Sequence, residues 1–137
     1  MTSIQIGDKI YASDPITGWG HYIRSQTILH KVIENGDVKS SIHYGSQSEL
    51  IDKECCLGIT PLFMMLQYSV IADFTQAIKA LVDKKLEIKT NFNRFFSNIE
   101  NAKYYGDTYI FRLMNKLKNA IGEEKFNLIK NCKDTDC

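Results

Sequence analysis

The chain has 137 residues, and its 17 lysines and arginines nearly balance 16 aspartates and glutamates, leaving a net charge of +1. This length suits one domain, residues 1–137, whose core needs neither a metal nor disulfides to hold it together. The balanced charge argues against a dedicated nucleic-acid or membrane-surface protein, because such proteins normally carry a plain basic footprint.

Residues 1–26 are the least regular part of the sequence, and we expect them to form an N-terminal cap. The apolar residues between Ile4 and Tyr11 suit a short strand, and the turn at Pro15 and the two glycines around Trp19 break any element that follows. Trp19 is interpreted either as an aromatic side chain at the edge of the core or as an exposed anchor for a partner.

From Thr27 onward the pattern is helical. Apolar residues from Ile28 to Ile33 recur at the spacing of one helical face, and Gly36 is a suitable stop. Asp37 is a good N-cap for a second helix that ends near Gly45. The sequence therefore predicts a helical hairpin.

A second hairpin follows a polar, turn-rich segment, residues 45–58, in which Leu50 and Ile51 are the expected inward anchors. Thr60 and Pro61 are a strong start signal, because threonine caps helices well and proline suits the first helical position. The partner helix is predicted to start near Phe74 and to close at Lys84 and Lys85, where cations favour the helix dipole.

Three more helices are predicted. Phenylalanines from Phe92 to Phe96 recur with Ile99 on one helical face and are interpreted as core residues. The next helix runs from Ile110 to Leu117, and Gly122 separates it from a last helix before the polar tail, residues 131–137. We expect about seven helices and little sheet.

Thirty-three residues separate Thr27 from Thr60, and each opens a similar phrase. The phrases Thr27-Ile28-Leu29-His30, Gly58-Ile59-Thr60-Pro61-Leu62 and, more distantly, Gly106-Asp107-Thr108-Tyr109-Ile110-Phe111 resemble the Gly-x-Thr-Pro-Leu-His opening of an ankyrin repeat. The segments 34–38 and 81–88 resemble the inter-helix turn and the second helix of that family. The resemblance implies a mainly α fold, a short stack of helical hairpins over residues 27–130 with an irregular N-terminal strand and loop cap.

The array is interrupted. Only the middle copy has Gly, Thr, Pro and Leu together, and the third opening follows the second by 48 residues. Residues 91–105 are therefore read as an insertion that carries its own aromatic helix. About three repeats are the minimum for a continuous core, so the N-terminal cap and the insertion are expected to shield the ends. A non-repeat helical domain is the alternative.

The four cysteines, Cys55, Cys56, Cys132 and Cys137, lack the CxxC spacing of zinc and redox motifs, and we expect free thiols. The only nucleophilic pairing that the composition permits is Cys55 or Cys56 with His30 or His43 as base. The resemblance instead gives His30 a structural role, because the family uses this histidine to tie turns together by hydrogen bonds.

Cofactor and metal sites are not predicted. No two histidines lie three or four residues apart, and the glycines around Trp19 lack the spacing and the lysine of a phosphate-binding loop. The basic series that includes Lys79, Lys85 and Arg94 is interpreted as a solvated helix face, since Asp83 and Glu87 interrupt it. We expect no cofactor, no metal and no nucleic-acid partner.

Ankyrin repeats bind proteins through their turn tips and the exposed side of their first helices, so the resemblance implies a protein-binding face. The implied positions, copy by copy, are Arg24, Gln26, Glu34 and Asn35; Leu57, Ile59, Gln67 and Tyr68; and Tyr105, Asp107, Asn115 and Lys116. They mix aromatic, aliphatic and charged groups, as interfaces do.

The expected function is a protein-interaction module that catalyses no reaction and binds a protein of unknown identity. The start of the chain lacks the pattern of a secretory signal, and no apolar run approaches the roughly 18 residues of a spanning helix, so we expect a cytoplasmic protein. A composition rich in Ile, Lys and Asn fits a bacterial or viral effector, and delivery into a host cell stays open. The alternatives are a dimeric helical inhibitor or regulator that pairs through residues 92–105, which leaves monomer and homodimer open, and, less favoured, a thiol-dependent enzyme.

Overall fold

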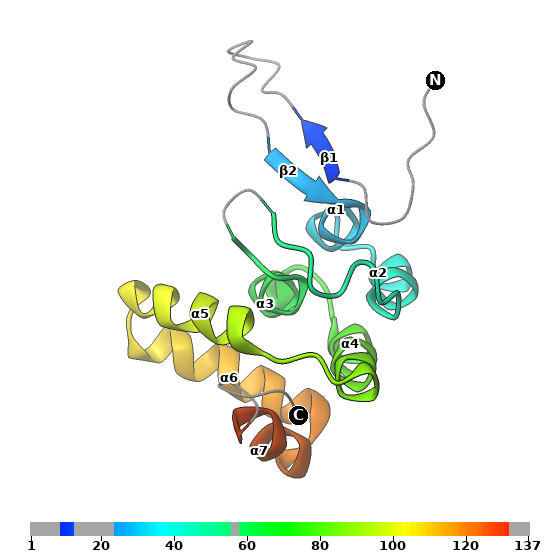
Figure 1. Ribbon diagram of the computed structural model, residues 1–137. Helices are drawn as coiled ribbons and strands as arrows, with labels where there is room; N and C mark the ends of the chain where they lie inside the picture. The colour runs from blue at the N-terminus through cyan, green and yellow to red at the C-terminus, as the bar shows by residue number, and fades with distance from the viewer. Residues whose placement is uncertain (1–8, 13–23, 56–57, 132–137) are drawn as a thin grey trace, which may run out of the picture.

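The computed structural model describes residues 9–12, 24–55 and 58–131, and these residues are mainly helical, as predicted (Figure 1). Two short antiparallel strands, β1 (Lys9–Ala12) and β2 (Arg24–Thr27), pair with Ile10 opposite Gln26. Seven α-helices follow within the described ranges: α1 (Ile28–Glu34), α2 (Val38–Gly45), α3 (Pro61–Gln67), α4 (Thr75–Ile88), α5 (Asn93–Ala102), α6 (Asp107–Ile121) and α7 (Glu123–Asn131). Two 3-10 turns, η1 (Tyr68–Val70) and η2 (Lys103–Tyr105), follow α3 and α5. Trp19, Cys56, Leu57 and the polar tail from Cys132 lie outside the described residues.

Helix α1 begins with a reciprocal cap between Thr27 and His30. The Thr27 hydroxyl accepts the His30 backbone N–H at 3.3 Å, and the His30 Nδ1 accepts the Thr27 backbone N–H at 3.4 Å. Histidine thus takes the place that Glu or Gln has in the usual capping box. The other ring nitrogen, Nε2, lies 3.0 Å from the carbonyl oxygen of Ile59 and must carry the proton, because a carbonyl only accepts. The buried His30 therefore ties α1 to the segment that leads into α3.

The turn between α1 and α2 depends on Gly36, as the sequence predicts. Its φ of +73° is left-handed, and the N–H of Asp37 reaches back to the carbonyl of Val32 at 2.9 Å. Asp37 then caps α2, since its carboxylate accepts the N–H of Ser40 at 3.1 Å. Hydrogen bonds from Ser40 hold the pKa of the Asp37 carboxyl below its ordinary value.

Replacing Gly36 with alanine is expected to lower the free energy of unfolding by about 1 kcal/mol, because a Cβ is strained at positive φ. A Cβ at this position would meet the Cδ1 atom of Ile71 at an ordinary 3.6 Å, so the loss arises from the backbone and not from a clash. Asparagine tolerates this conformation better, and Gly36→Asn should recover part of the loss. Urea unfolding followed by circular dichroism measures both, and equal stability of wild type and Gly36→Ala would contradict the assignment.

The first four helices stack as two layered hairpins. Helix α3 starts as predicted, with Thr60 as N-cap and Pro61 at its first position. Figure 1 views α1 to α4 nearly end-on, with α1 above α3 and α2 above α4, and the contacts between these helices agree. The core between the layers includes the fully buried Leu29, Met65 and Leu81. Leu50 and Ile51 are also buried, as predicted.

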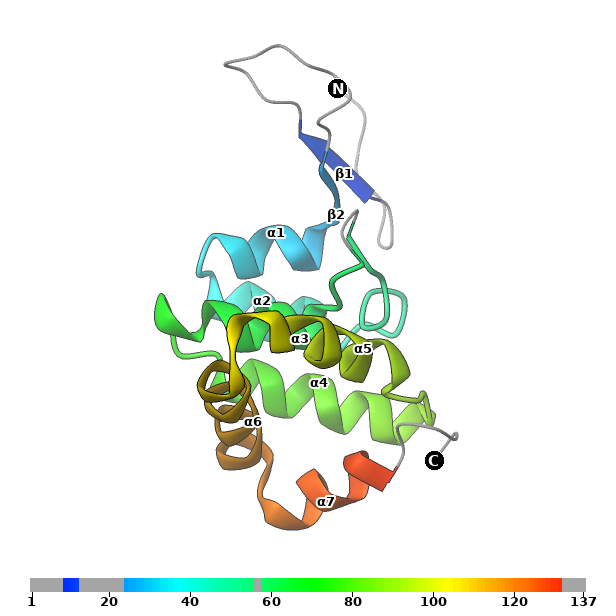
Figure 2. The ribbon, with the colours of Figure 1, turned by 90° about the vertical axis from the view of Figure 1, so that its left-hand side faces the viewer.

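After α4 the direction of the helices changes. Helix α4 continues to Ile88, beyond the predicted end at Lys85, and stops at Lys89, which is left-handed at φ 60°. Helix α6 runs across the stack. It extends in the plane of Figure 1, where α1 to α4 are seen nearly end-on, and it is itself seen end-on in Figure 2. Thr108 lies inside α6 and does not cap it; Gly106 precedes the helix instead. The phrase at Thr108 therefore does not open a third hairpin aligned with the first two.

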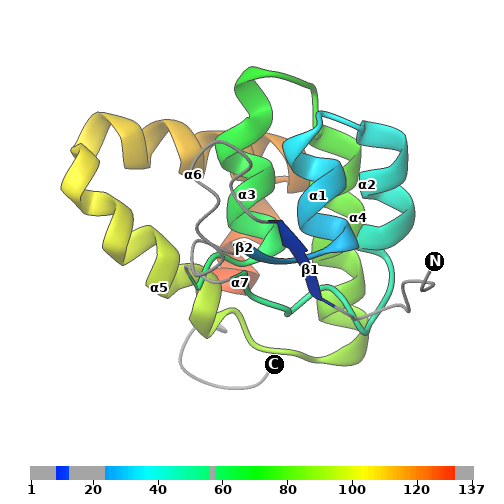
Figure 3. The same cartoon turned by 90° about the horizontal axis from the view of Figure 1, so that it is seen from above.

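The phenylalanines at the start of α5 were interpreted as core residues. Phe92 and Phe95 are buried, which confirms the interpretation for these two. Phe96 is half-buried. Beyond α5, η2 and the start of α6 extend away from the hairpin stack (Figure 3). This turn carries Tyr104 and Tyr105 at its outer end, where both are exposed.

Candidate protein-binding face

The turns that end the two hairpins lie side by side. The backbone of Gly36 approaches the side chains of Ile71 and Ala72, which belong to the connection between α3 and α4. Val70 and Ile71 on this connection are 74% and 58% exposed, although both are aliphatic. Together the two turns place exposed apolar side chains at one end of the helix stack.

Helix α6 faces the second of these turns across a hollow of about 550 Å³. Lys116, Asn119 and Ala120 form its α6 wall, and residues 69–73 with Thr75 and Ile78 form the opposite wall. We name this surface the turn-tip face and define it by Asn35, Tyr68, Val70, Ile71 and Lys116. One predicted residue from each of the three copies lies at this end of the stack. Lys116 lines the hollow, Tyr68 precedes the lining residue Ser69, and Asn35 precedes Gly36, which lies beside Ile71.

A chain of aromatic contacts extends the turn-tip face. The Gln67 amide donates to the Tyr109 hydroxyl at 3.4 Å, and the Tyr109 ring lies 5.7 Å from the ring of Tyr105. Tyr105 in turn lies edge-on to Tyr104 at 5.6 Å. Two predicted residues, Gln67 and Tyr105, are therefore connected through Tyr109, which was not among the implied binding positions.

The other predicted binding residues lie outside the turn-tip face or at its border. Glu34 forms an ion pair with Lys31 at 3.8 Å, next to Asn35. Arg24 and Gln26 belong to β2, at the opposite end of α1 from the turn tips (Figure 2). Ile59, at that same end, is half-buried. Asp107 and Asn115 are exposed on α6, and Leu57 lies outside the described residues.

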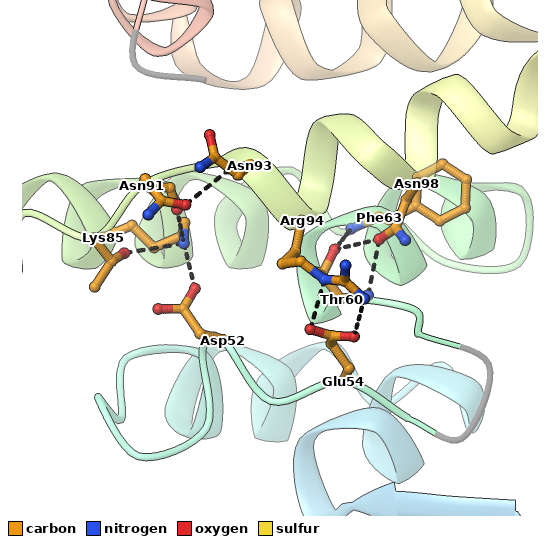
Figure 4. A network of polar contacts seen from close by, with 10 residues as sticks. Asp52, Glu54, Thr60, Phe63, Lys85, Asn91, Asn93, Arg94 and Asn98 are labelled. Carbon is orange, nitrogen blue, oxygen red and sulfur yellow. Dashed lines mark hydrogen bonds and ion pairs between the residues drawn. The ribbon is translucent and has the colours of Figure 1, made fainter. Parts of the chain in front are cut away.

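A polar cluster at the far end of the stack was not predicted (Figure 4). Lys85, interpreted from the sequence as solvated, is only 4% exposed, which corrects that interpretation. Its ammonium donates to Asp52, to the Thr90 hydroxyl at 3.0 Å and to the Asn91 carbonyl at 2.9 Å. Burial lowers the pKa of the Lys85 ammonium, and the hydrogen bond and charge of Asp52 act in the opposite direction.

Two neighbours complete this cluster. Arg94 forms a bidentate ion pair with Glu54, with N–O distances of 2.7 and 2.8 Å, and this pairing raises the pKa of Arg94. The Asn98 side chain accepts the N–H and hydroxyl of Thr60 at 3.0 and 2.8 Å and donates to the carbonyl of Gly58 at 2.8 Å (Figure 4).

The cavity beside these groups, of about 390 Å³, is lined by Asp52, Lys85 and Arg94 among others. All three ammonium protons of Lys85 have acceptors, and Arg94 is engaged by Glu54. These contacts fasten Asp52, Glu54 and Gly58 to α4, α5 and the turn between them, so we assign the cluster a structural role.

For the described residues Cys55, His30 and His43, the geometry offers little to the thiol chemistry that the sequence permits. Both ring nitrogens of His30 are engaged, by Thr27 and by the Ile59 carbonyl, and Cys55 is buried. His43 is exposed and packs edge-on against Tyr44 at 4.9 Å. Within the described ranges, no group of three or more His, Cys, Asp or Glu side chains could hold a metal ion.

The segment named for the dimeric alternative is mostly interior. Phe92 and Phe95 are 1% and 2% exposed, so they contribute to the core and not to a surface. Only Tyr104 and Tyr105 at its end are strongly exposed aromatics. None of the helices in the described part of the chain combines the length and apolar character that a bilayer crossing requires.

Comparison with protein-family models, with curated proteins and with solved structures finds no match to this chain.

Proposed function

We propose that this protein is an ankyrin-like interaction module that binds a protein partner through the turn-tip face. The observation that carries the proposal is the exposure of Val70 and Ile71, at 74% and 58%, beside a hollow that α6 closes. Exposed apolar side chains around a concave surface, with a polar rim, are typical of protein interfaces. A cytoplasmic effector or regulator would use such a face without catalysing a reaction.

Two further features support an ankyrin-like stack. The predicted interval between Thr27 and Thr60 coincides with two hairpins that start with the same threonine cap. His30 hydrogen-bonds across the stack to Ile59, which is the role that the resemblance implies. Both features concern the scaffold, and the exposed turn tips are what a partner would contact.

Changing Ile71 to aspartate is expected to weaken partner binding about tenfold or more, because an apolar anchor in an interface is replaced by a charge that must be desolvated. Partners are captured from a host-cell lysate on immobilised protein, identified by mass spectrometry, and their affinities are then measured with purified components. Lys53→Asp is the matched control, since Lys53 is exposed on the loop at the other end of the stack. Equal affinity of wild type and Ile71→Asp would contradict the proposal, provided that the far-ultraviolet circular dichroism is unchanged.

A further inference from the structure

The turn between α1 and α2 holds the one Asn-Gly pair of the sequence. Of the eight glycines, only Gly36 follows an asparagine. Asparagine side chains are thermolabile, and the backbone nitrogen of the next residue is the nucleophile that attacks them. A glycine at that next position has no Cβ to obstruct the attack. Asn35 is exposed, so its side-chain amide is open to water.

We propose that Asn35 is a site of spontaneous deamidation. The backbone nitrogen of Gly36 loses its proton and attacks the carbonyl carbon of the Asn35 side chain. A C–N bond forms there, the bond to the side-chain nitrogen breaks, and ammonia leaves, which gives a five-membered succinimide ring. Water then opens the ring at either carbonyl, and the product is aspartate or isoaspartate. Water is the one co-reactant, and no group is oxidised or reduced.

The folded turn restrains this reaction, because the attacking nitrogen is engaged in a hydrogen bond. The N–H of Gly36 donates to the carbonyl of Ile33 at 3.0 Å, and the N–H of Asp37 donates to the carbonyl of Val32 at 2.9 Å. The attack on Asn35 therefore requires a local opening of the turn, of the kind that surface loops undergo without global unfolding. The rate of deamidation should follow the stability of this turn.

Both products place a new carboxylate at the C-terminal end of α1. The helix dipole disfavours negative charge at this end. Lys31, the lysine in the last turn of α1, already forms an ion pair with Glu34 at 3.8 Å. The new charge is therefore expected to weaken the turn slightly in either product.

Isoaspartate also lengthens the main chain by one methylene group between residues 35 and 36. The hydrogen bonds donated by Gly36 and Asp37 both span residue 35, so a longer main chain cannot keep the geometry of both. Gly36 lies beside the side chain of Ile71, and a displaced turn changes this contact on the turn-tip face. The reaction itself does not depend on the proposed function, because it needs no partner.

The test ages the full-length protein in weakly alkaline buffer and locates deamidated asparagines by digestion and mass spectrometry. Asn35 should convert several times faster than Asn101 and Asn119, which are exposed but precede alanines within helices. Asn35→Gln should abolish the fast conversion, because glutamine would have to close a six-membered ring. Asp37→Ala removes the N-cap of α2 and should accelerate the conversion by favouring the open turn.

The effect on the turn is measured separately. The isoaspartate form is isolated by chromatography, and it should unfold at lower urea than Asn35→Asp, which carries the same charge on an unaltered main chain. Equal unfolding midpoints would contradict the damage to the turn. Conversion of Asn35 no faster than that of Asn101 and Asn119 would overturn the site itself. An unchanged rate in Asp37→Ala would overturn the control of the reaction by the turn.

Discussion

Replacing Asn98 with alanine is expected to lower the free energy of unfolding by about 3 kcal/mol. The asparagine is 5% exposed and joins α5 to the start of α3 through three hydrogen bonds, two from Thr60 and one to Gly58. Alanine removes the acceptor for the Thr60 groups and the donor for the Gly58 carbonyl. Each buried group left without a partner costs about 1–3 kcal/mol, and water that enters the site recovers part of this.

Urea unfolding monitored by circular dichroism measures this loss. Ser97→Ala is the matched control, because Ser97 is exposed on the same helix and its replacement should change stability by no more than about 0.5 kcal/mol. An Asn98→Ala variant as stable as the Ser97→Ala variant would show that α5 is not held to α3 by these bonds.

Removing Asp52 should destabilise the protein more than removing its partner Lys85. The Lys85 side chain is 5% exposed and the Asp52 side chain 49%, so only the ammonium is left without water when its partner is lost. Asp52→Ala is expected to cost about 3 kcal/mol, because it leaves a buried charge without a counter-charge. Lys85→Met should cost about 1 kcal/mol, because the apolar chain fills the same space and Asp52 can be solvated.

The double variant provides the control for this asymmetry. With the ammonium gone, the additional loss of Asp52 should change little, so Asp52→Ala with Lys85→Met should be about as stable as Lys85→Met alone. If the losses in the free energy of unfolding of the two single variants simply added in the double variant, this would contradict a buried pair of Lys85 and Asp52.

The stability of Asp52→Ala should also depend on pH in the alkaline range. Burial already lowers the pKa of Lys85 below 10.5, and the loss of Asp52 lowers it further. Between the folded and the unfolded pKa the unfolded chain binds more protons, so the free energy of unfolding rises with pH. The deficit of Asp52→Ala relative to wild type should therefore shrink as the pH approaches about 10. A constant deficit from neutral to alkaline pH would argue against a buried charge.

The helices were predictable because their signals are local. Thr27, Gly36, Asp37 and the pair Thr60–Pro61 act within a few residues of the helix ends that they define, and the structure uses each as predicted. The course of α6 was not predictable in the same way. Its direction depends on packing against α3 and α4, which no capping residue or spacing within 107–121 encodes.

The polar cluster depends on contacts between distant parts of the sequence. Asn98 and Thr60 lie 38 residues apart, and Lys85 and Asp52 lie 33 apart. One feature of the sequence could have identified both Asn98 and Lys85 as buried polar residues. Asn98 falls among the buried Phe95 and Ile99, and Lys85 continues the buried face of α4, so each is a polar residue in an apolar stripe that needs a buried partner.

The turn-tip face was also predicted only in part, because the exposure of a side chain depends on the three-dimensional arrangement. Asn35, Tyr68 and Lys116 were implied by the resemblance, whereas Val70 and Ile71 were not. Aliphatic residues are normally assigned to the core, and only the three-dimensional arrangement shows that these two are exposed.

The most direct test of the turn-tip face is site-specific photo-cross-linking in the cell that contains the partner. A photoreactive side chain is placed at Ile71, at Tyr68 or, as the control, at Lys53 on the opposite end of the stack. The proposed function predicts one discrete cross-linked protein from positions 71 and 68, and none from position 53. Cross-links that form equally from all three positions, or only from position 53, would contradict it.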